Sequence, residues 1–258
     1  MNISFFNISL LLIPLFILVL GLRFFRINLL KKAATSIGRM ILQLFLVGVY
    51  LEYIFKFNNW AVNFIYILIM VLVASLSTID VVKLNYKKFI LPLFGSIFLS
   101  WVTVYTLYQF IILHDINFFE SRYIIPVSGM LLGNLLQGQI IFLNNFFTQI
   151  KDGEDSYFYL LSMGATKFEA LREFYRRSII SSLQPSLANM ATIGLVALPG
   201  MMTGQILAGA SPFTAIKYQI SIMLAIFCIR GLSLLFTTFA INKIAFDRFS
   251  RLKRDVFR

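Results

Sequence analysis

The chain has 258 residues, of which 59% are hydrophobic and only 13% are charged, about half the charged fraction of a typical soluble domain. A soluble fold of this length could not bury so much apolar side chain, because surface-to-volume scaling leaves too much of it in water. Composition therefore excludes an ordinary soluble protein. The net charge of +12 would favour nucleic acid as the partner of a soluble protein, but in a membrane protein cations have another role.

Seven apolar runs are long enough to cross a bilayer. The first is free of charge from Ser4 to Leu22 and no basic residue precedes it, so we expect a true span rather than a signal peptide. The sequence predicts one all-α domain over 1–258, a polytopic membrane protein with about seven transmembrane helices. The predicted spans are 5–22, 38–55, 60–79, 89–113, 123–148, 185–209 and 213–242.

The Lys and Arg residues indicate which way the chain crosses the membrane. Nineteen of the 23 fall in alternate segments, namely 23–39, 83–88, 151–177 and 243–258. Cytoplasmic loops carry the excess of cations, which places the N-terminus outside and the C-terminus in the cytoplasm. The charge is thus a topology signal in a multi-pass protein of the cell (inner or plasma) membrane. The bilayer, not nucleic acid, is its expected surrounding.

The sequence lacks the common motifs of nucleotide-binding, metalloprotease and hydrolase sites. There is no G-x-x-x-x-G-K-[ST], so we expect no ATP bound through a P-loop, and there is no H-E-x-x-H or G-x-S-x-G. The only histidine, His114, lies beside Asp115 in an outer loop and is expected to be solvated. Glu52 and Asp80 lie towards opposite ends of their spans. We therefore expect no enzyme and no cofactor in this chain, and we assign no metal ligand.

A segment outside the membrane follows the fifth span, over about 150–182. Thr166 and Glu169 have the T-x-x-E spacing of a capping box, and Gly164 just before them permits a bend. The pattern predicts that one short helix ends near Met163 and that a second begins at Lys167.

The second of these helices has two faces. The apolar stripe is Phe168, Leu171 and Tyr175, and the charged flank is Arg172, Arg176 and Arg177. One interpretation is an interfacial helix with its stripe among lipid headgroups. The other is a docking surface for a soluble partner, and the residues alone leave both open.

The fifth and sixth predicted spans are unusually polar. Asn134 and Gln137 are costly in lipid and should face protein or a water-filled path. In the sixth span Pro199 and Gly200 should kink or break the helix. The candidate path or gate residues there are Pro199, Gly200, Met201, Met202, Thr203, Gly204 and Gln205. Close helix packing with gap-filling methionines is the alternative, favoured for the glycines, whereas Thr203 and Gln205 favour a path.

Arg230 lies inside the seventh span, where a buried cation is expensive. It is either part of the function, a structural partner of an amide on the fifth or sixth span, or a side chain that snorkels to the inner face.

The run from Leu161 to Thr166 and the run from Gly194 to Gly209, with its Pro-Gly-Met-Met-Thr-Gly-Gln core, resemble the FetB-type membrane subunits of iron-export ABC transporters. Plant aluminium-tolerance membrane subunits are similar to the same family. The resemblance covers essentially the whole chain. It implies a permease that works, as a homodimer, with separate P-loop ATPase subunits that hold ATP and Mg.

The resemblance makes docking the preferred interpretation of 160–177. The implied ATPase-coupling residues are Met163, Gly164, Ala165, Thr166, Phe168, Glu169, Leu171 and Arg172. The glutamate-alanine-alanine opening of bacterial coupling loops is absent, and Arg176-Arg177 stand where Leu-Pro commonly ends that loop.

The substrate that the resemblance implies is iron, another metal ion or a metal complex, and export rests on the resemblance alone. Hydroxyls, amides, carbonyls and thioethers suit a hydrated or chelated species in transit. Two rivals remain. An ATP-independent carrier or channel predicts an intramembrane acid, and a membrane scaffold or stress sensor predicts that Thr203 and Gln205 tolerate bulky apolar replacement.

Overall fold

The computed structural model describes residue 10 and residues 12–24, 30–247 and 249–258, and these form two units. The N-terminal unit is 1–57 and the main unit is 58–258. Apart from a short 3₁₀ helix at Arg254–Val256, the helices of the described part are all α-helices. The expected all-α membrane fold is confirmed, since five of the described helices are long and apolar enough to cross a bilayer. They are α3 (Leu30–Phe57), α4 (Trp60–Val82), α5 (Tyr86–Ile111), α6 (Ser121–Asp152) and α10 (Pro212–Ile244).

The N-terminal unit holds α2 (Leu12–Phe24) and α3. The first part of the predicted span 5–22 lies outside the described residues. The described part of this helix, α2, has 13 residues. The second predicted span, 38–55, lies inside α3.

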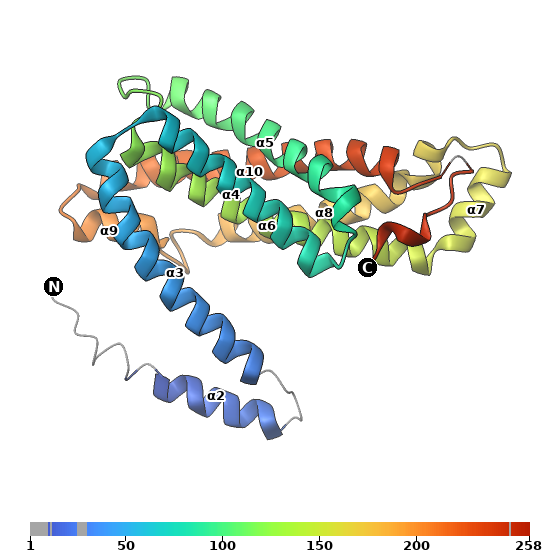
Figure 1. The fold of residues 1–258 in the computed structure, drawn as a ribbon, viewed down its shortest axis with the longest axis horizontal. Coiled ribbons are helices and arrows are strands. Elements are labelled where there is room, and N and C mark those ends of the chain that lie inside the picture. Colours follow the sequence, from blue (N-terminus) through green and yellow to red (C-terminus); the bar gives the residue numbers. More distant parts are fainter. Residues whose placement is uncertain (1–9, 11, 25–29, 248) are drawn as a thin grey trace. The chain divides into compact units, whose positions relative to one another are not determined.

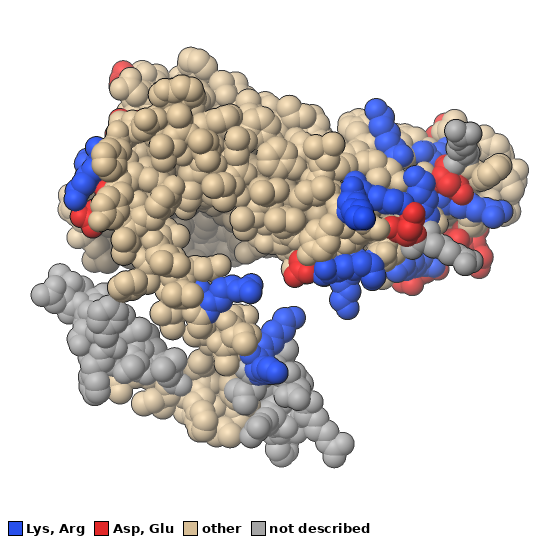
Figure 2. Space-filling model, in the orientation of Figure 1, with Lys and Arg blue, Asp and Glu red and all other residues tan. Residues whose placement is uncertain are grey.

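In the main unit α4, α5, α6 and α10 match four predicted spans to within a few residues at each end (Figure 1). Two shorter helices, α7 (Glu154–Ser162) and α9 (Gly200–Leu207), lie at opposite ends of this unit, and α8 (Lys167–Thr192) runs between them. Lys, Arg, Asp and Glu gather at the end that carries α7 (Figure 2). A charged end next to an uncharged shaft is the surface expected of a protein whose shaft lies in lipid.

The predicted span 185–209 is interrupted, as expected, but the interruption is longer than a kink. Its first part belongs to α8, which ends at Thr192, and α9 begins only at Gly200. The break predicted at Pro199 and Gly200 coincides with the start of α9, which the missing N–H of proline suits, but the sequence missed the earlier end of α8. Gly194 has φ +86°, a left-handed conformation that ends a helix at little cost in glycine, and its N–H donates to the carbonyl of Ala197 at 3.0 Å.

The end of the main unit near α7 has an aromatic core. The rings of Phe146 on α6 and Tyr175 on α8 stack with centroids 4.6 Å apart. The C-terminal residues close this core from outside: Val256 is fully buried, and its carbonyl accepts a hydrogen bond from the N–H of Asn85 at 2.9 Å. The ion pair between Arg258 and Asp80 joins the last residue to α4. The basic tail is therefore part of the fold, not only a topology signal.

Removal of residues 254–258 should lower the thermal stability of the purified chain, because it uncovers apolar side chains under Val256 and Phe257 and breaks two ion pairs, Arg258 with Asp80 and Lys88 with Asp255. Thermal unfolding in detergent followed by intrinsic fluorescence measures the effect. Phe249→Ala is the control, since this tail side chain is 81% exposed. Equal melting temperatures for the truncated and intact chains would show that the tail does not support the core.

Candidate functional site

The segment that the family resemblance assigns to ATPase docking, residues 160–177, is here called the docking segment and is built around one turn. The helix α7 ends at Ser162, Gly164 has φ +90° and α8 begins at Lys167, as the sequence predicts. The capping box is also confirmed. The Glu169 carboxylate accepts from the Thr166 N–H at 2.8 Å and from its hydroxyl at 2.6 Å, while the Glu169 N–H donates to the Thr166 hydroxyl at 3.4 Å. The start of α8 is thereby fixed against the turn.

Thr166→Ala removes the N-cap side chain of α8 and should destabilise the first turn of that helix by about 1 kcal/mol, so that the turn frays. Hydrogen bonds from the Thr166 hydroxyl and then from its N–H lower the pKa of Glu169. A carboxyl whose pKa is lowered by folding stabilises the fold above its ordinary pKa, and this stabilisation is lost as the pH falls through the lowered value. The protection factors for amide hydrogen exchange of residues 166–170, which correct for the intrinsic pH dependence of exchange, should therefore fall in acid, and Thr166→Ala should show low protection already at neutral pH. Exchange that is independent of both changes would contradict this role.

The coupling residues divide into an exposed and a buried set. Met163 is 70% exposed and Phe168 47% exposed, whereas Leu171 is fully buried. Gly164, Thr166, Glu169 and Arg172 are exposed, and Ala165 is half-buried. Leu171 and Tyr175 pack on the protein's own aromatic core, so the apolar stripe faces inward for most of its length. Leu171 therefore positions the docking segment from within instead of contacting lipid or a partner.

The sequence missed the exposure of two apolar side chains on α7, which are Tyr159 just before the docking segment and Leu160 at its start, 63% and 40% exposed. Together with Met163 they extend the apolar surface next to the turn. The five residues 157–161 are all apolar, so the pattern alone gave no signal of which side would stay exposed.

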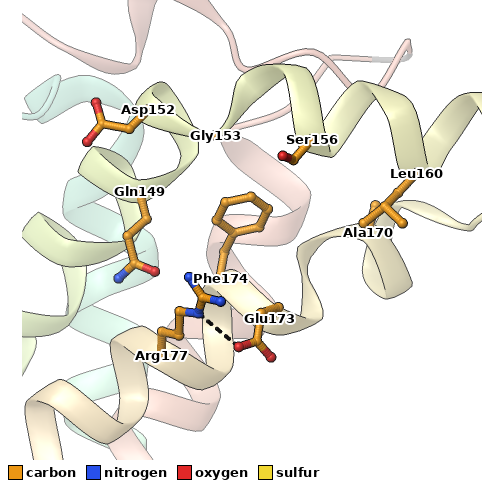
Figure 3. Close-up of a pocket in the computed structure, with 9 residues that line it drawn as sticks. All are labelled: Gln149, Asp152, Gly153, Ser156, Leu160, Ala170, Glu173, Phe174 and Arg177. Carbon is orange, nitrogen blue, oxygen red and sulfur yellow. Dashed lines mark hydrogen bonds and ion pairs between the residues drawn. The ribbon is translucent and has the colours of Figure 1, made fainter.

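A cavity of about 390 Å³ lies between the end of α6, α7 and α8 (Figure 3). Asp152 lies on the α6 side, Leu160 on the α7 side, and Phe174 and Arg177 project from α8. The Arg177 Nε donates to the Glu173 carboxylate at 2.8 Å, which lowers the pKa of Glu173. This cavity, here called the α7 cavity, borders the docking segment and offers both charge signs to a protein partner.

A second cavity, about 380 Å³, lies between α6, α8, α9 and α10 and is here called the α9 cavity. It brings together three predicted path residues, Asn134, Pro199 and Met201. The polar residues on its wall are Asn134, Asn189, Thr192 and Gln219. Three methionines also line it, Met130, Met201 and Met223. The sequence missed Asn189 and Gln219, because only the break after Thr192 opens the space that both border.

The other predicted path residues do not line the α9 cavity. Gln137 is exposed on α6, Gly200 and Gly204 are exposed with open space beside them, and Met202 is half-buried. The hydroxyl of Thr203 donates to the carbonyl of Pro199 at 3.1 Å within α9. Gln205 is half-buried with a side-chain oxygen that lacks a hydrogen-bond partner. Apart from Gln137 on α6, these residues belong to α9 but do not line the cavity.

Arg230 on α10 is 4% exposed and joins three helices. It donates to the carbonyl of Asn134 on α6 at 2.6 Å, to the carbonyl of Ser182 on α8 at 3.4 Å and to the hydroxyl of Ser186. Its stem packs against Gly138, where an added Cβ would lie 2.8 Å from the Arg230 Cγ. The contacts match the structural alternative, with α6 and α8 partners, although the acceptor on Asn134 is the carbonyl and not the amide.

The two acids singled out by the sequence are both paired. Glu52 accepts from Lys56 at 3.2 Å at the end of α3, and Asp80 pairs with Arg258 near the end of α4. His114 lies beside Asp115 at 3.1 Å with an exposed side chain, as expected. Among the described residues no group of three His, Cys, Asp or Glu side chains could hold a metal ion.

Comparison with known sequences places this architecture in a family. The profile of the uncharacterised protein family UPF0014 matches residues 5–246. The chain belongs to the UPF0014 family. The UPF0014 membrane protein YjkA of Bacillus subtilis is 31% identical over 222 residues, which are 85% of this chain and 86% of YjkA.

Two further relatives carry functional names. A protein of Escherichia coli named as a probable iron export permease, FetB, is 33% identical over 79% of this chain and 77% of its own length. The protein ALUMINUM SENSITIVE 3 of Arabidopsis thaliana is 32% identical over 73% of this chain and 67% of its own. No solved structure matches. The resemblance to FetB-type and plant aluminium-tolerance proteins is thus confirmed, and this UPF0014 chain is a multi-pass membrane protein.

Proposed function

We propose that this UPF0014 chain is the membrane subunit of an ABC transporter, a permease without its own ATPase site. A separate P-loop ATPase holds ATP and Mg and docks on residues 160–177. ATP-driven closure of paired ATPases moves that segment and opens or closes the α9 cavity. The name of FetB, an export permease, supports transport as the activity.

The observation that carries this proposal is the continuity of α8. One helix of 26 residues begins at the capped turn of the docking segment and ends at Thr192 on the wall of the α9 cavity. It is about 39 Å long. Because an α-helix transmits displacement along its axis and α8 is packed on α6 and α10, a push at Lys167 reaches Asn189 and Thr192 directly. The break at 193–199 then frees α9 to move independently of α8.

The docking surface has the composition that a stable protein contact needs. Exposed apolar side chains, Met163 and Phe168, belong to the same segment as Leu160, which lines the α7 cavity. A surface that mixes apolar anchors with a charged rim is typical of protein interfaces. Lipid contact is disfavoured because the stripe formed by Leu171 and Tyr175 is already buried in the protein.

The proposed cargo is iron or another metal ion, or its complex, and the proposed direction is export, both following the name of FetB. The assembly is a homodimer with two ATPases. Exposed polar groups on the membrane helices, such as Gln137 on α6 and Gln184 on α8, are better placed against a second copy or a water-filled path than against lipid.

An ATP-independent carrier is the less favoured alternative. Coupling to protons would require an acid inside the membrane, and both Glu52 and Asp80 lie near helix ends in ion pairs. We expect no transport by this chain without an ATPase.

Binding of the ATPase tests the docking surface. Met163→Glu and Phe168→Glu should each weaken co-purification of the full chain with a candidate P-loop ATPase by at least about tenfold, since a charge placed at an apolar contact must be desolvated. Phe249→Glu is the control, an exposed aromatic on the cytoplasmic tail outside the segment. Undiminished binding by both docking variants would overturn the assignment of 160–177.

A further inference from the structure

The residues around the α9 cavity indicate the charge of the ligand that it binds. The inference drawn from them rests on the proposed transport function. The residues on the cavity wall are all uncharged, but two positive features lie directly behind them. We infer that the cavity takes an anionic, oxygen-rich ligand, namely a carboxylate or a metal chelate with net negative charge, and not a bare metal cation.

The first positive feature is the guanidinium of Arg230. It lies on α10 one helical turn beyond Ile226, which lines the cavity, and it bonds to the carbonyl of Asn134, which lines the cavity too. All three of its hydrogen bonds in the described part of the chain go to neutral oxygens, and no ion pair there includes it. A charge that is 4% exposed and has no counterion acts strongly on its surroundings, because little water screens it. It attracts anions and repels cations.

The second positive feature is the start of α9. Pro199 and Met201 line the cavity, so the first turn of this helix borders it. Its N-cap, Pro199, makes no side-chain cap, and the first N–H groups of a helix carry a partial positive charge that favours anions. Both features therefore have the same sign, although they come from different helices.

The third feature is an unsatisfied polar atom on the cavity wall. Gln219 is 6% exposed and lines the cavity, yet its side-chain oxygen has no hydrogen-bond partner. A buried amide whose oxygen lacks a partner is costly, and a polar ligand would remove that cost. Its NH2 group can donate to a carboxylate and its oxygen can accept from a hydroxyl or a bound water. Asn189 and Thr192 across the cavity offer the same kinds of bond.

A chelate with net negative charge fits all three features, whereas a bare di- or trivalent cation would meet Arg230 without a carboxylate on the wall to offset it. The cavity, about 380 Å³, is within the range of small-molecule sites. Metal transport by this route would move the metal inside a shell of acidic ligands.

Binding to the full chain in lipid nanodiscs, with no ATPase or ATP present, tests the inference apart from the docking proposal. The probes in equilibrium dialysis are labelled citrate, ferric citrate and labelled Fe²⁺ alone. Wild type should retain citrate or ferric citrate and should not retain Fe²⁺ alone. Retention of iron-free citrate identifies the organic anion as the ligand, and retention of ferric citrate only identifies the chelate.

Two substitutions of Gln219 test whether the wall of the α9 cavity binds the ligand and whether the bound ligand is negatively charged. Gln219→Leu should weaken retention about tenfold by removing the hydrogen bonds, and Gln219→Glu should abolish it by adding a negative charge. Gln43→Leu, exposed on α3, should bind like wild type. Retention of Fe²⁺ alone, no retention of either anion, or anion binding unchanged in both Gln219 variants would overturn the inference. ATP-driven Fe²⁺ flux could still be found in that case, so the proposed function would stand or fall separately.

Discussion

Gly138→Ala should lower the melting temperature of the purified chain, and Gly133→Ala on the same helix should not. A Cβ at Gly138 would lie 2.8 Å from the Arg230 Cγ and 2.9 Å from its Cδ and Nε. Arg230 cannot move away cheaply, because its hydrogen bonds to α6 and α8 hold its head in place. Overpacking of this kind costs about 1–3 kcal/mol, and a shift of Arg230 would add broken bonds to a buried charge.

Gly133 is the matched control because nothing lies within 4 Å of its added Cβ. Alanine there should gain about 0.5–1 kcal/mol from helix propensity. Thermal unfolding of both variants in the same detergent therefore gives shifts of opposite sign. If both alanines raise the melting temperature, Arg230 has room to move and does not clamp α6 to α8 and α10.

Gly164→Val should abolish ATP-driven transport while the bundle stays folded. At φ +90° a β-branched residue is strained, and the least costly relief is a change of the turn between α7 and α8. That change tilts the exposed residues Met163 and Phe168 away from their positions and loosens the capping box of Thr166. The measurement is ATPase co-purification and ATP-dependent flux, with thermal unfolding as the check of the fold.

Gly209→Val provides a strain-matched control, since Gly209 has φ +96° with open space around it. It follows α9, at the opposite end of the main unit from α7 (Figure 1). It should destabilise the chain to a similar degree and leave ATPase binding intact. Equal loss of ATPase binding in both variants would mean that general destabilisation, not the docking turn, explains the effect.

Local signals predicted the docking turn well. Thr166 and Glu169 satisfy each other's backbone N–H within four residues, and Gly164 supplies the bend, so neighbouring residues alone determine this geometry. The long spans were predicted for a similar reason, because bilayer thickness sets the length of an apolar run. In the main unit their boundaries differ by up to four residues, as helix ends depend on caps that hydropathy does not include.

Contacts between distant segments were not predictable in this way. The inward direction of Leu171 and the burial of Val256 depend on an aromatic core assembled from α6, α8 and the tail. Likewise Gln219 and Asn189 border one cavity only because α8 ends at Thr192. Arg230 could be flagged as costly from its position in an apolar run, but its acceptors lie about 45 and 96 residues away in sequence.

The most direct test of the account is flux through the complete assembly. Proteoliposomes that contain this chain and a P-loop ATPase partner should move labelled iron only when ATP is present on the side of the docking segment. The iron is supplied as Fe²⁺ in one arm and as ferric citrate in the other, and the inference on the α9 cavity predicts movement of ferric citrate. The chain without the ATPase, and the assembly with Gly164→Val, should show no ATP-dependent movement. Full flux through the chain alone without ATP would contradict the central claim that a docked ATPase drives this permease.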